Sequence, residues 1–280
     1  MKRKRGIKLI ALLLIIIVLP IFLYTQNNSI QITSITIASD KLPDEFEEYR
    51  ILHLSDLHNK RFGNNQKSIV EKMIKINPDI ILVTGDTVDS RRYDEEPCIE
   101  LFKQITDIAP VYLVTGNHEA RRSEQFESFE NRLEDTGVTV LRNEGKWIEI
   151  NNSSIALLGV DDPYMQGANL LETELRQLSA DYDNQYKILL SHRPELMDVY
   201  AANNIDLVFS GHAHGGQIRF PVVGGLVAPD QGWLPKYTSG AYREKNTTML
   251  VSRGLGNSIV PQRIFNRPEL VVVTLAKNKR

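Results

Sequence analysis

Short apolar runs that end in polar side chains constrain the fold of this chain more than any other feature. Each run holds four or five mostly β-branched or aliphatic residues, which is too short for a helix, and its residues are apolar at successive positions. That pattern is typical of strands buried on both faces. Six such runs occupy residues 50–56, 79–86, 110–117, 154–162, 186–192 and 205–212.

Amphipathic helical patterns separate several of these runs. Apolar stripes at helical spacing fall within 69–74, 101–108 and 126–133, with Ser123 as the expected N-cap of the last. Two later runs, 247–254 and 269–276, are expected to be strands with no helix between them. The order predicts an α/β fold in four layers, an α/β/β/α sandwich whose two sheets are mixed.

The composition is that of an ordinary folded protein and excludes several classes. A hydrophobic share of 42% and a charged share of 24% argue against disorder. The net charge of −2 provides no overall field that would attract nucleic acid, so no nucleic-acid partner is expected. Cys98 is the only cysteine, which excludes an intramolecular disulfide and a thiolate zinc cluster.

Residues 1–28 differ in kind from the rest and are expected to form a membrane anchor. Five Lys or Arg stand among the first eight residues, and an almost unbroken apolar run from Leu9 to Tyr24 follows. No typical cleavage pattern comes after it, so we expect an uncleaved single transmembrane helix, with a cleaved signal peptide as the alternative. Its basic end would lie in the cytoplasm, which places a single domain, residues 29–280, outside the cell membrane.

Metal-binding side chains gather where the predicted strands end. Five of the six histidines follow such strands, in loops that should meet at one edge of the sheets. The donors are Asp56 and His58 after the first run, Asp86 after the second, Asn117 after the third, His192 after the fifth, and His212 and His214 after the sixth.

These seven donors predict a centre with two metal ions. Carboxylate, imidazole and amide groups suit Mn²⁺, iron, Zn²⁺ or Co²⁺. Seven donors exceed what one tetrahedral site uses, so two adjacent divalent ions that share a carboxylate are expected. Each short pattern alone is more often a turn or a helix start, but packing does not place all of them in order at strand ends. His53, inside the first run, is expected to be a structural histidine.

The motifs resemble those of the calcineurin-like metallophosphoesterase superfamily over residues 50 to 276. They stand as Asp56-Leu-His58, Gly85-Asp86-Thr-Val-Asp89, Gly116-Asn117-His118-Glu119, His192 and Gly211-His212-Ala-His214. The stretches "GHAHGGQIRFP", "SRGLG" and "RPELVVVTL" are similar to the membrane-associated bacterial branch. Relatives in that branch act on phosphodiester or pyrophosphate bonds, some of them in lipid-linked sugar nucleotides.

The resemblance assigns a role to each motif residue. It implies that one ion is held by Asp56, His58, Asp86 and His214, and that the other is held by Asp86, Asn117, His192 and His212, with Asp86 bridging. A hydroxide shared by the two ions would attack phosphorus in line. His118 would lie near the leaving oxygen as general acid or phosphate stabiliser, and Asp89 would orient it and stabilise its charge. Glu119 is expected to support the loop that carries these ligands.

The resulting prediction is a membrane-anchored phosphohydrolase that acts on a small or lipid-linked phosphate ester. Ser90 stands where the eukaryotic-type protein phosphatases have an arginine, which argues against a phosphoprotein substrate. Three alternatives remain at this stage: a broad phosphomonoesterase, an exonuclease, and a metal-bound binding domain without catalysis. The exonuclease is disfavoured because no basic stripe is present. The identity of the metal, the substrate and the oligomeric state are left open by the sequence.

Overall fold

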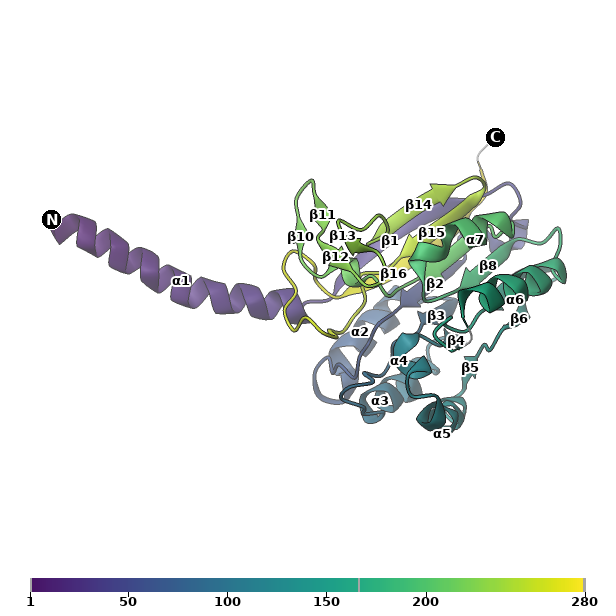
Figure 1. Cartoon of the computed structure of the whole chain (residues 1–280), viewed down its shortest axis with the longest axis horizontal. Coiled ribbons are helices and arrows are strands. Elements are labelled where there is room, and N and C mark those ends of the chain that lie inside the picture. Colours follow the sequence, from purple (N-terminus) through teal and green to yellow (C-terminus); the bar gives the residue numbers. More distant parts are fainter. Residues whose placement is uncertain (1, 166, 279–280) are drawn as a thin grey trace.

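All eight apolar runs form strands. In each of the first six runs, the strand ends before the polar residues with which the run closes. Strand β3, for example, covers Ile80–Thr84 with every residue buried, and Asp86 follows in the loop. The computed structural model describes residues 2–165 and 167–278, without the side chains of residues 2–14 and 168. Within that range a long helix projects from an α/β domain (Figure 1).

Two six-stranded sheets form the centre of the domain, and both are mixed, as predicted. In the first, β2 to β5 run parallel, and β16 pairs parallel with β1 but antiparallel with β2. In order across the sheet its strands are β1 (Gln31–Ala38), β16 (Glu269–Ala276), β2 (Arg50–Leu54), β3 (Ile80–Thr84), β4 (Val111–Val114) and β5 (Val138–Val140).

The second sheet has a parallel centre flanked by two antiparallel edge strands. Its order is β14 (Gly240–Glu244), β15 (Thr247–Val251), β9 (Leu207–Ser210), β8 (Lys187–Leu190), β7 (Ser153–Gly159) and β6 (Glu144–Ile150). Two small hairpins follow β9: β10 (Arg219–Phe220) with β11 (Gly224–Gly225), and β12 (Val227–Ala228) with β13 (Gly232–Trp233).

Helices cover the outer faces of the sheets, so apolar side chains form three layers of core. One cluster lies between the first sheet and α2, α3 and α5, a second lies between the sheets, and a third lies between the second sheet and α6 and α7. The helices are α1 (Lys2–Asn28), α2 (Lys67–Ile76), α3 (Glu96–Ile105), α4 (Asn117–Ala120), α5 (Ser123–Glu134), α6 (Ala168–Ala180) and α7 (Met197–Ala202).

The start of α5 differs from the prediction. Ser123 is the first residue inside the helix, and Arg122 precedes it without a capping hydrogen bond from its side chain. The arginine side chain instead donates to the Ser90 carbonyl at 2.8 Å, which ties the start of α5 to the loop after β3. The contact between Arg122 and the loop after β3, and not an N-cap side chain, therefore sets the start of this helix.

The predicted anchor falls on α1, and half of its side chains lie outside the described residues. Among the residues that the structure describes, no helix is both long and apolar enough to cross a membrane. The residues from Ile15 to Tyr24 include seven exposed large hydrophobic side chains. Asn27, near the end of the helix, accepts from the Arg263 amide at 2.8 Å and so joins α1 to the domain.

Candidate metal centre

The seven predicted ligands come from both sheets and meet at the carboxyl ends of their strands. Asp56, Asp86 and Asn117 follow β2, β3 and β4 of the first sheet. The three histidines 192, 212 and 214 follow β8 and β9 of the second. Neighbouring parallel strands end at the same edge of a sheet, so these loops converge.

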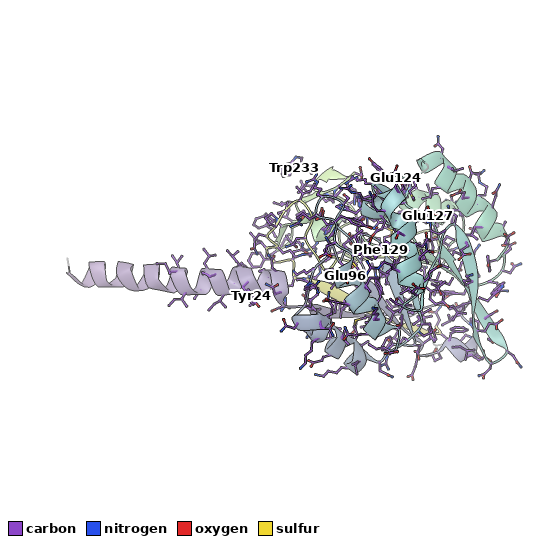
Figure 2. The ribbon with its side chains drawn as sticks, turned by 90° about the horizontal axis from the view of Figure 1, so that it is seen from below. Tyr24, Glu96, Glu124, Glu127, Phe129 and Trp233 are labelled. Carbon is purple, nitrogen blue, oxygen red and sulfur yellow. The ribbon has the colours of Figure 1, made fainter. Side chains whose placement is uncertain are left out.

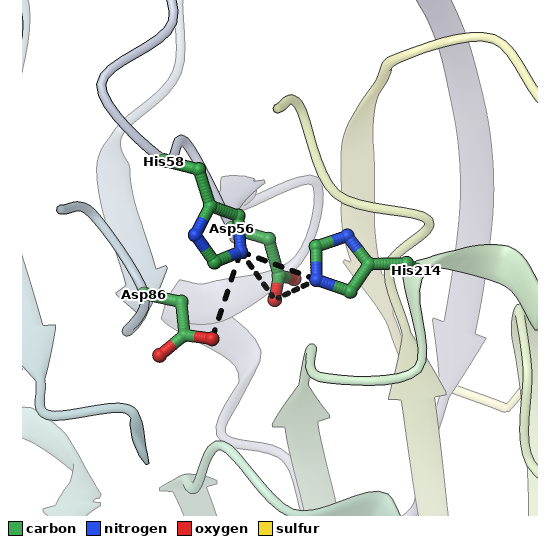
Figure 3. Close-up of side chains that lie close together, drawn as sticks. All are labelled: Asp56, His58, Asp86 and His214. Carbon is green, nitrogen blue, oxygen red and sulfur yellow. Dashed lines mark hydrogen bonds and ion pairs between the residues drawn. The ribbon is translucent and has the colours of Figure 1, made fainter. Parts of the chain in front are cut away.

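Four of these side chains form a buried group, drawn in Figure 3. The nitrogens His58 Nε2 and His214 Nε2 lie 3.2 Å apart. His58 Nε2 is 3.6 Å from Asp86 Oδ2, and His214 Nε2 is 3.5 Å from Asp56 Oδ1. Ligands of one ion with bonds of about 2.1 Å lie about 3.0 to 3.4 Å apart, so this spacing fits a shared ion.

A second group uses the same carboxylate. His192 Nε2 lies 3.3 Å from Asp86 Oδ2 and 3.0 Å from His212 Nδ1. Asn117 Oδ1 is buried and has no hydrogen-bond partner among the described residues. A buried amide oxygen without a partner is costly, and an ion beside it would satisfy it. The two groups therefore fit a centre for two ions, and Asp86 Oδ2 faces both.

The backbone is bent sharply to present these side chains. Asp56, His58, Asp86, His212 and His214 all have positive φ, between 47° and 65°. Residues other than glycine rarely adopt this conformation, and such strain clusters at functional sites. Glycines allow the close approach that results: a Cβ on Gly211 would lie 1.8 Å from Ser55 Oγ and 2.6 Å from Asp56 Oδ2.

Glu119 holds the loop that carries the shared carboxylate. Its buried side chain accepts hydrogen bonds from the amides of Asp86, Thr87 and Gly116 at 2.7 to 2.8 Å. The Thr87 hydroxyl donates to it as well, at 2.8 Å. Asp86 Oδ1 in turn accepts from the His118 amide at 2.8 Å, which leaves Oδ2 directed to the histidines.

Burial and pairing set the charges of the histidines. Burial lowers the pKa of His58 to about 3 and holds the pKa of His214 well below its usual value. Both rings are neutral at pH 7, and a neutral ring has a lone pair for an ion. Burial by itself would also lower the pKa of His192. The attraction between the charged ring and the Asp86 carboxylate outweighs burial and raises the pKa of His192 to about 10. His192 must therefore release a proton before Nε2 can bind an ion.

His118 lies beside the two groups and belongs to neither. Its Nδ1 accepts from the Ser90 amide at 2.9 Å, so the proton of the neutral ring is on Nε2. That Nε2 is 4.0 Å from Asp86 Oδ2 and 3.4 Å from Ser258 Oγ. His118 is thus arranged to donate a hydrogen bond into the centre.

Asp89 is placed for only one part of its expected role, since it is near His118 but does not orient it. Its Oδ1 lies 3.9 Å from His118 Nδ1, which is beyond hydrogen-bond distance. The carboxylate accepts instead from the Arg91 amide at 2.9 Å and from Arg92 Nη2 at 2.8 Å. The Ser90 amide orients the ring, and Asp89 acts on it only by its charge.

His53 also differs in part from expectation. It is fully buried in β2, and its Nε2 lies 2.8 Å from Thr84 Oγ1. Its Nδ1, however, has no partner in the described part of the chain. Burial lowers the pKa of His53 to about 3, so the ring is a neutral structural group.

Two residues outside the motifs, Asp230 and Arg193, contact Nε2 of His212. Asp230, in the loop between β12 and β13, lies 2.9 Å from His212 Nε2. Arg193 donates to the same carboxylate, and also to Asp162 at 2.6 and 3.0 Å. A carboxylate on the outer nitrogen of a histidine fixes its tautomer and leaves the other nitrogen for an ion. The sequence offers no spacing rule that would identify Asp230, although Arg193 directly follows His192.

Two hollows flank the centre. One, of about 300 Å³, is lined by Asp86, His118, Arg121 and Ser258 among others. The other, of about 470 Å³, is lined by His58, Lys60, Arg92 and Asn257 among others. Since Asn257 and Ser258 are neighbours in the chain, one loop borders both hollows. The first hollow borders ligands of both ion groups, whereas the second borders the centre only at His58.

This fold and centre define the class of a metal-dependent hydrolase, and comparison with known proteins narrows it. Residues 49–216 match the family described as calcineurin-like phosphoesterase. The chain is 30% identical over 257 residues to the uncharacterized metallophosphoesterase YkuE of Bacillus subtilis (strain 168), covering 90% of this chain and 87% of YkuE. It is 28% identical over 238 residues to phosphodiesterase YaeI of Escherichia coli (strain K12), covering 83% and 84% of the two chains.

A solved structure agrees at the level of the fold. TT1561 of Thermus thermophilus aligns with a TM-score of 0.52 at 14% identity, over 74% of this chain and 90% of its own. The chain belongs to the calcineurin-like phosphoesterase family. It is a metal-dependent phosphoesterase whose buried Asp and His groups fit two ions.

Proposed function

We propose that the enzyme hydrolyses a phosphodiester or pyrophosphate bond in a small or lipid-linked substrate at a membrane. The observation that carries the reaction is the position of Asp86 Oδ2, within 3.6 Å of His58 and 3.3 Å of His192, so that one carboxylate serves both groups. Bound there, two divalent ions would supply an activated water and neutralise the phosphoryl oxygens.

The ligand roles follow the geometry of the two groups. Asp56, His58, Asp86 and His214 would hold one ion. Asp86, His192 and His212 would hold the other, with Asn117 Oδ1 as the further donor. The set suits manganese, iron, zinc or cobalt, and their availability decides between them.

His118 is the proposed hydrogen-bond donor to the leaving oxygen. Its Nε2 carries the proton, faces the cavity and is not engaged in either ion group. A hydrogen bond from Nε2 would stabilise the negative charge that develops on this oxygen as the bond to phosphorus breaks, and the leaving group would then take a proton from solvent. Asp89 Oδ1, 3.9 Å from Nδ1, acts on the ring only through its charge.

The two hollows favour a diester or pyrophosphate over a monoester. A monoester has one substituent on phosphorus, whereas a diester has two, and each hollow has room for one of them. The 28% identity to a protein named phosphodiesterase points the same way.

Activity tests use the full chain in detergent, stripped by chelator and reloaded with Mn²⁺, Co²⁺, Zn²⁺ or Mg²⁺. We expect about two ions per chain and metal-dependent hydrolysis that favours bis-p-nitrophenyl phosphate over p-nitrophenyl phosphate. Asp86→Asn should lower the rate at least about 100-fold, because both ions lose a ligand. Asp107→Asn, at an exposed position just after α3, is the matched control. A preference for the monoester would contradict the diesterase proposal, and the absence of metal binding would contradict the centre itself.

We also propose that α1 anchors the domain at the outer face of the cell membrane. Its sequence supports this with a basic start followed by the apolar run from Leu9 to Tyr24. The described part of α1 carries exposed apolar side chains and projects away from the domain (Figure 1). Protease added to intact cells should degrade the domain, and the membrane-bound protein should keep its own N-terminus. A protected domain or a cleaved N-terminus would overturn the orientation or the anchor, respectively.

A further inference from the structure

Exposed apolar side chains outside α1 are concentrated in one part of the domain. Twelve large hydrophobic residues are exposed in the described chain after residue 30, and seven of them lie within 220–234 or 259–265. The other five are single residues on separate elements, which is ordinary for a soluble surface. We call six of the seven the apolar rim: Phe220, Val222, Val223, Trp233, Leu234 and Phe265.

The rim is one continuous surface. Phe220, Val222 and Phe265 surround the same hollow. The Arg219 amide donates to the Ile264 carbonyl at 3.0 Å, and the Leu234 amide donates to the Leu226 carbonyl at 2.8 Å. The two hairpins and the 259–265 segment are thereby held side by side, as Figure 1 shows for β10 to β13.

The rim is also continuous with α1. The rings of Phe22 and Phe265 pack edge to face with their centroids 5.5 Å apart. Both views of the molecule place the rim at the end of the domain from which α1 projects; Figure 2 labels Trp233 there. The apolar surface of the helix between Ile15 and Tyr24 therefore leads directly onto the rim.

The composition and conformation of the rim fit a lipid surface. Asp230 is the one carboxylate within residues 218–234, it is paired with Arg193 and His212, and residues 257–268 contain no Asp or Glu. At the tip of the first hairpin Val222 is fully exposed with φ of 72°, and the Val223 amide donates to the Pro221 carbonyl at 2.9 Å. A β-branched residue at positive φ is strained by about 1–3 kcal/mol, so this turn presents two valines outward at a cost.

We propose that the apolar rim inserts into the interfacial layer of the lipid bilayer to which α1 leads. Trp233 would lie at the level of the headgroups, where tryptophan is favoured. Exposed apolar patches of this kind mark protein or membrane contacts, and the continuity with α1 selects the membrane. The inference rests on the proposed anchoring by α1 and does not depend on the proposed reaction.

This placement would bring the catalytic centre to the headgroup layer. Ile259, the seventh exposed residue, lines the cavity that also contains His118 and His212. Pro229 and Asp230, which lie between β12 and β13, line the same cavity. A phosphate ester in a lipid headgroup would therefore reach the centre from the side where the rim meets the bilayer.

The two tryptophans of the chain allow a matched test with the full-length protein. Trp147→Phe leaves Trp233 as the only reporter, and Trp233→Phe leaves Trp147, which is 44% exposed on the edge strand β6. Each variant is reconstituted into phosphatidylcholine–phosphatidylglycerol vesicles, with or without phosphatidylcholine brominated near the headgroup end of its acyl chain. We expect the brominated lipid to quench Trp233 and to leave Trp147 unquenched.

A further variant separates insertion from folding. Val222→Asp combined with Val223→Asp, in the Trp147→Phe background, should reduce the quenching of Trp233, because carboxylates are unfavourable in that layer. Hydrolysis of soluble bis-p-nitrophenyl phosphate should be unchanged, since neither valine belongs to the centre. Equal quenching of the two tryptophans would overturn the proposal. The proposal would also be overturned if Trp233 became shielded from solvent only as the amount of protein per vesicle rises. That result would indicate that a second copy of the chain covers the rim. The quenching result stands even if no phosphate ester is hydrolysed.

Discussion

Asp230 lies 2.9 Å from His212 Nε2, the ring nitrogen that does not face His192. The carboxylate accepts the Nε2 proton, so His212 Nδ1 keeps its lone pair and faces His192 Nε2 at 3.0 Å. This contact lowers the pKa of Asp230 below its usual value, chiefly through the hydrogen bond from His212. Asp230 is thus a positioning residue for the second ion group.

Asp230→Asn should weaken binding of one ion by about 10- to 100-fold and leave the other unchanged, because only His212 loses its orienting partner. Stepwise affinities measured by competition with a chelating dye would check this. Asp198→Asn, at an exposed position on α7, is the control. Two unchanged affinities would show that His212 is oriented by other contacts.

Glu119→Gln should lower the free energy of unfolding by about 3 kcal/mol. The amide can accept through only one of its ends, so the donors on the other end lose their partner in a buried site. Urea unfolding in excess chelator would measure this without a contribution from ion binding. Glu71→Gln changes a half-exposed side chain on α2 and should shift stability by less than about 0.5 kcal/mol. A similar loss in both variants would contradict the role of Glu119.

His118→Asn should lower kcat by about 10²- to 10⁴-fold without changing the metal content. The loss should be larger for diphenyl phosphate than for bis-p-nitrophenyl phosphate, because a poor leaving group carries more negative charge and depends more on a hydrogen-bond donor. Ser258→Ala removes the hydroxyl 3.4 Å from Nε2 and serves as the comparison. Equal losses for the two leaving groups would exclude His118 as the donor to the leaving oxygen.

Protonation of His53 should make the protein less stable in mild acid. Its pKa is about 3 when folded and about 6.5 when unfolded, so the unfolded state binds the extra proton between these values. The contribution of this pKa difference to the free energy of unfolding is complete above pH 6.5. It is lost at about 1.4 kcal/mol per pH unit as the pH falls below that value. His53→Leu should reduce the slope of unfolding free energy against pH between 6.5 and 5. Identical slopes would mean that the ring is protonated in the folded state.

The strands and their terminal ligands could be predicted because both are local signals. A run such as 79–86 shows its burial in consecutive apolar residues and its ligand in the residue where the run stops. The meeting of these ligands around Asp86 then follows from parallel strands that end at one edge. The two hairpins directly after β9 were not predicted, since the strands from β10 to β13 have two residues each and no periodicity.

The supporting contacts could not be predicted for a different reason. Asp230 stands 18 residues after His212, in a tight turn where an aspartate is ordinary turn chemistry. The contact from Ser90 to His118 is made by a backbone amide, so no side chain in the sequence indicates it. This amide, and not Asp89, orients the ring. β1 and β6 were not identified either, because edge strands alternate in burial and lack the continuous apolar pattern.

The division of the ligands between the two sheets has a consequence for biosynthesis. Asp56, Asp86 and Asn117 belong to the first half of the chain, whereas the three histidines of the second sheet come last, at 192, 212 and 214. No nascent chain that ends before His214 contains the full set, so the centre can be completed only after the ligand-bearing strands of both sheets have been made. The ions are therefore acquired wherever the chain finishes folding, and the metal supply of that compartment decides what the enzyme carries.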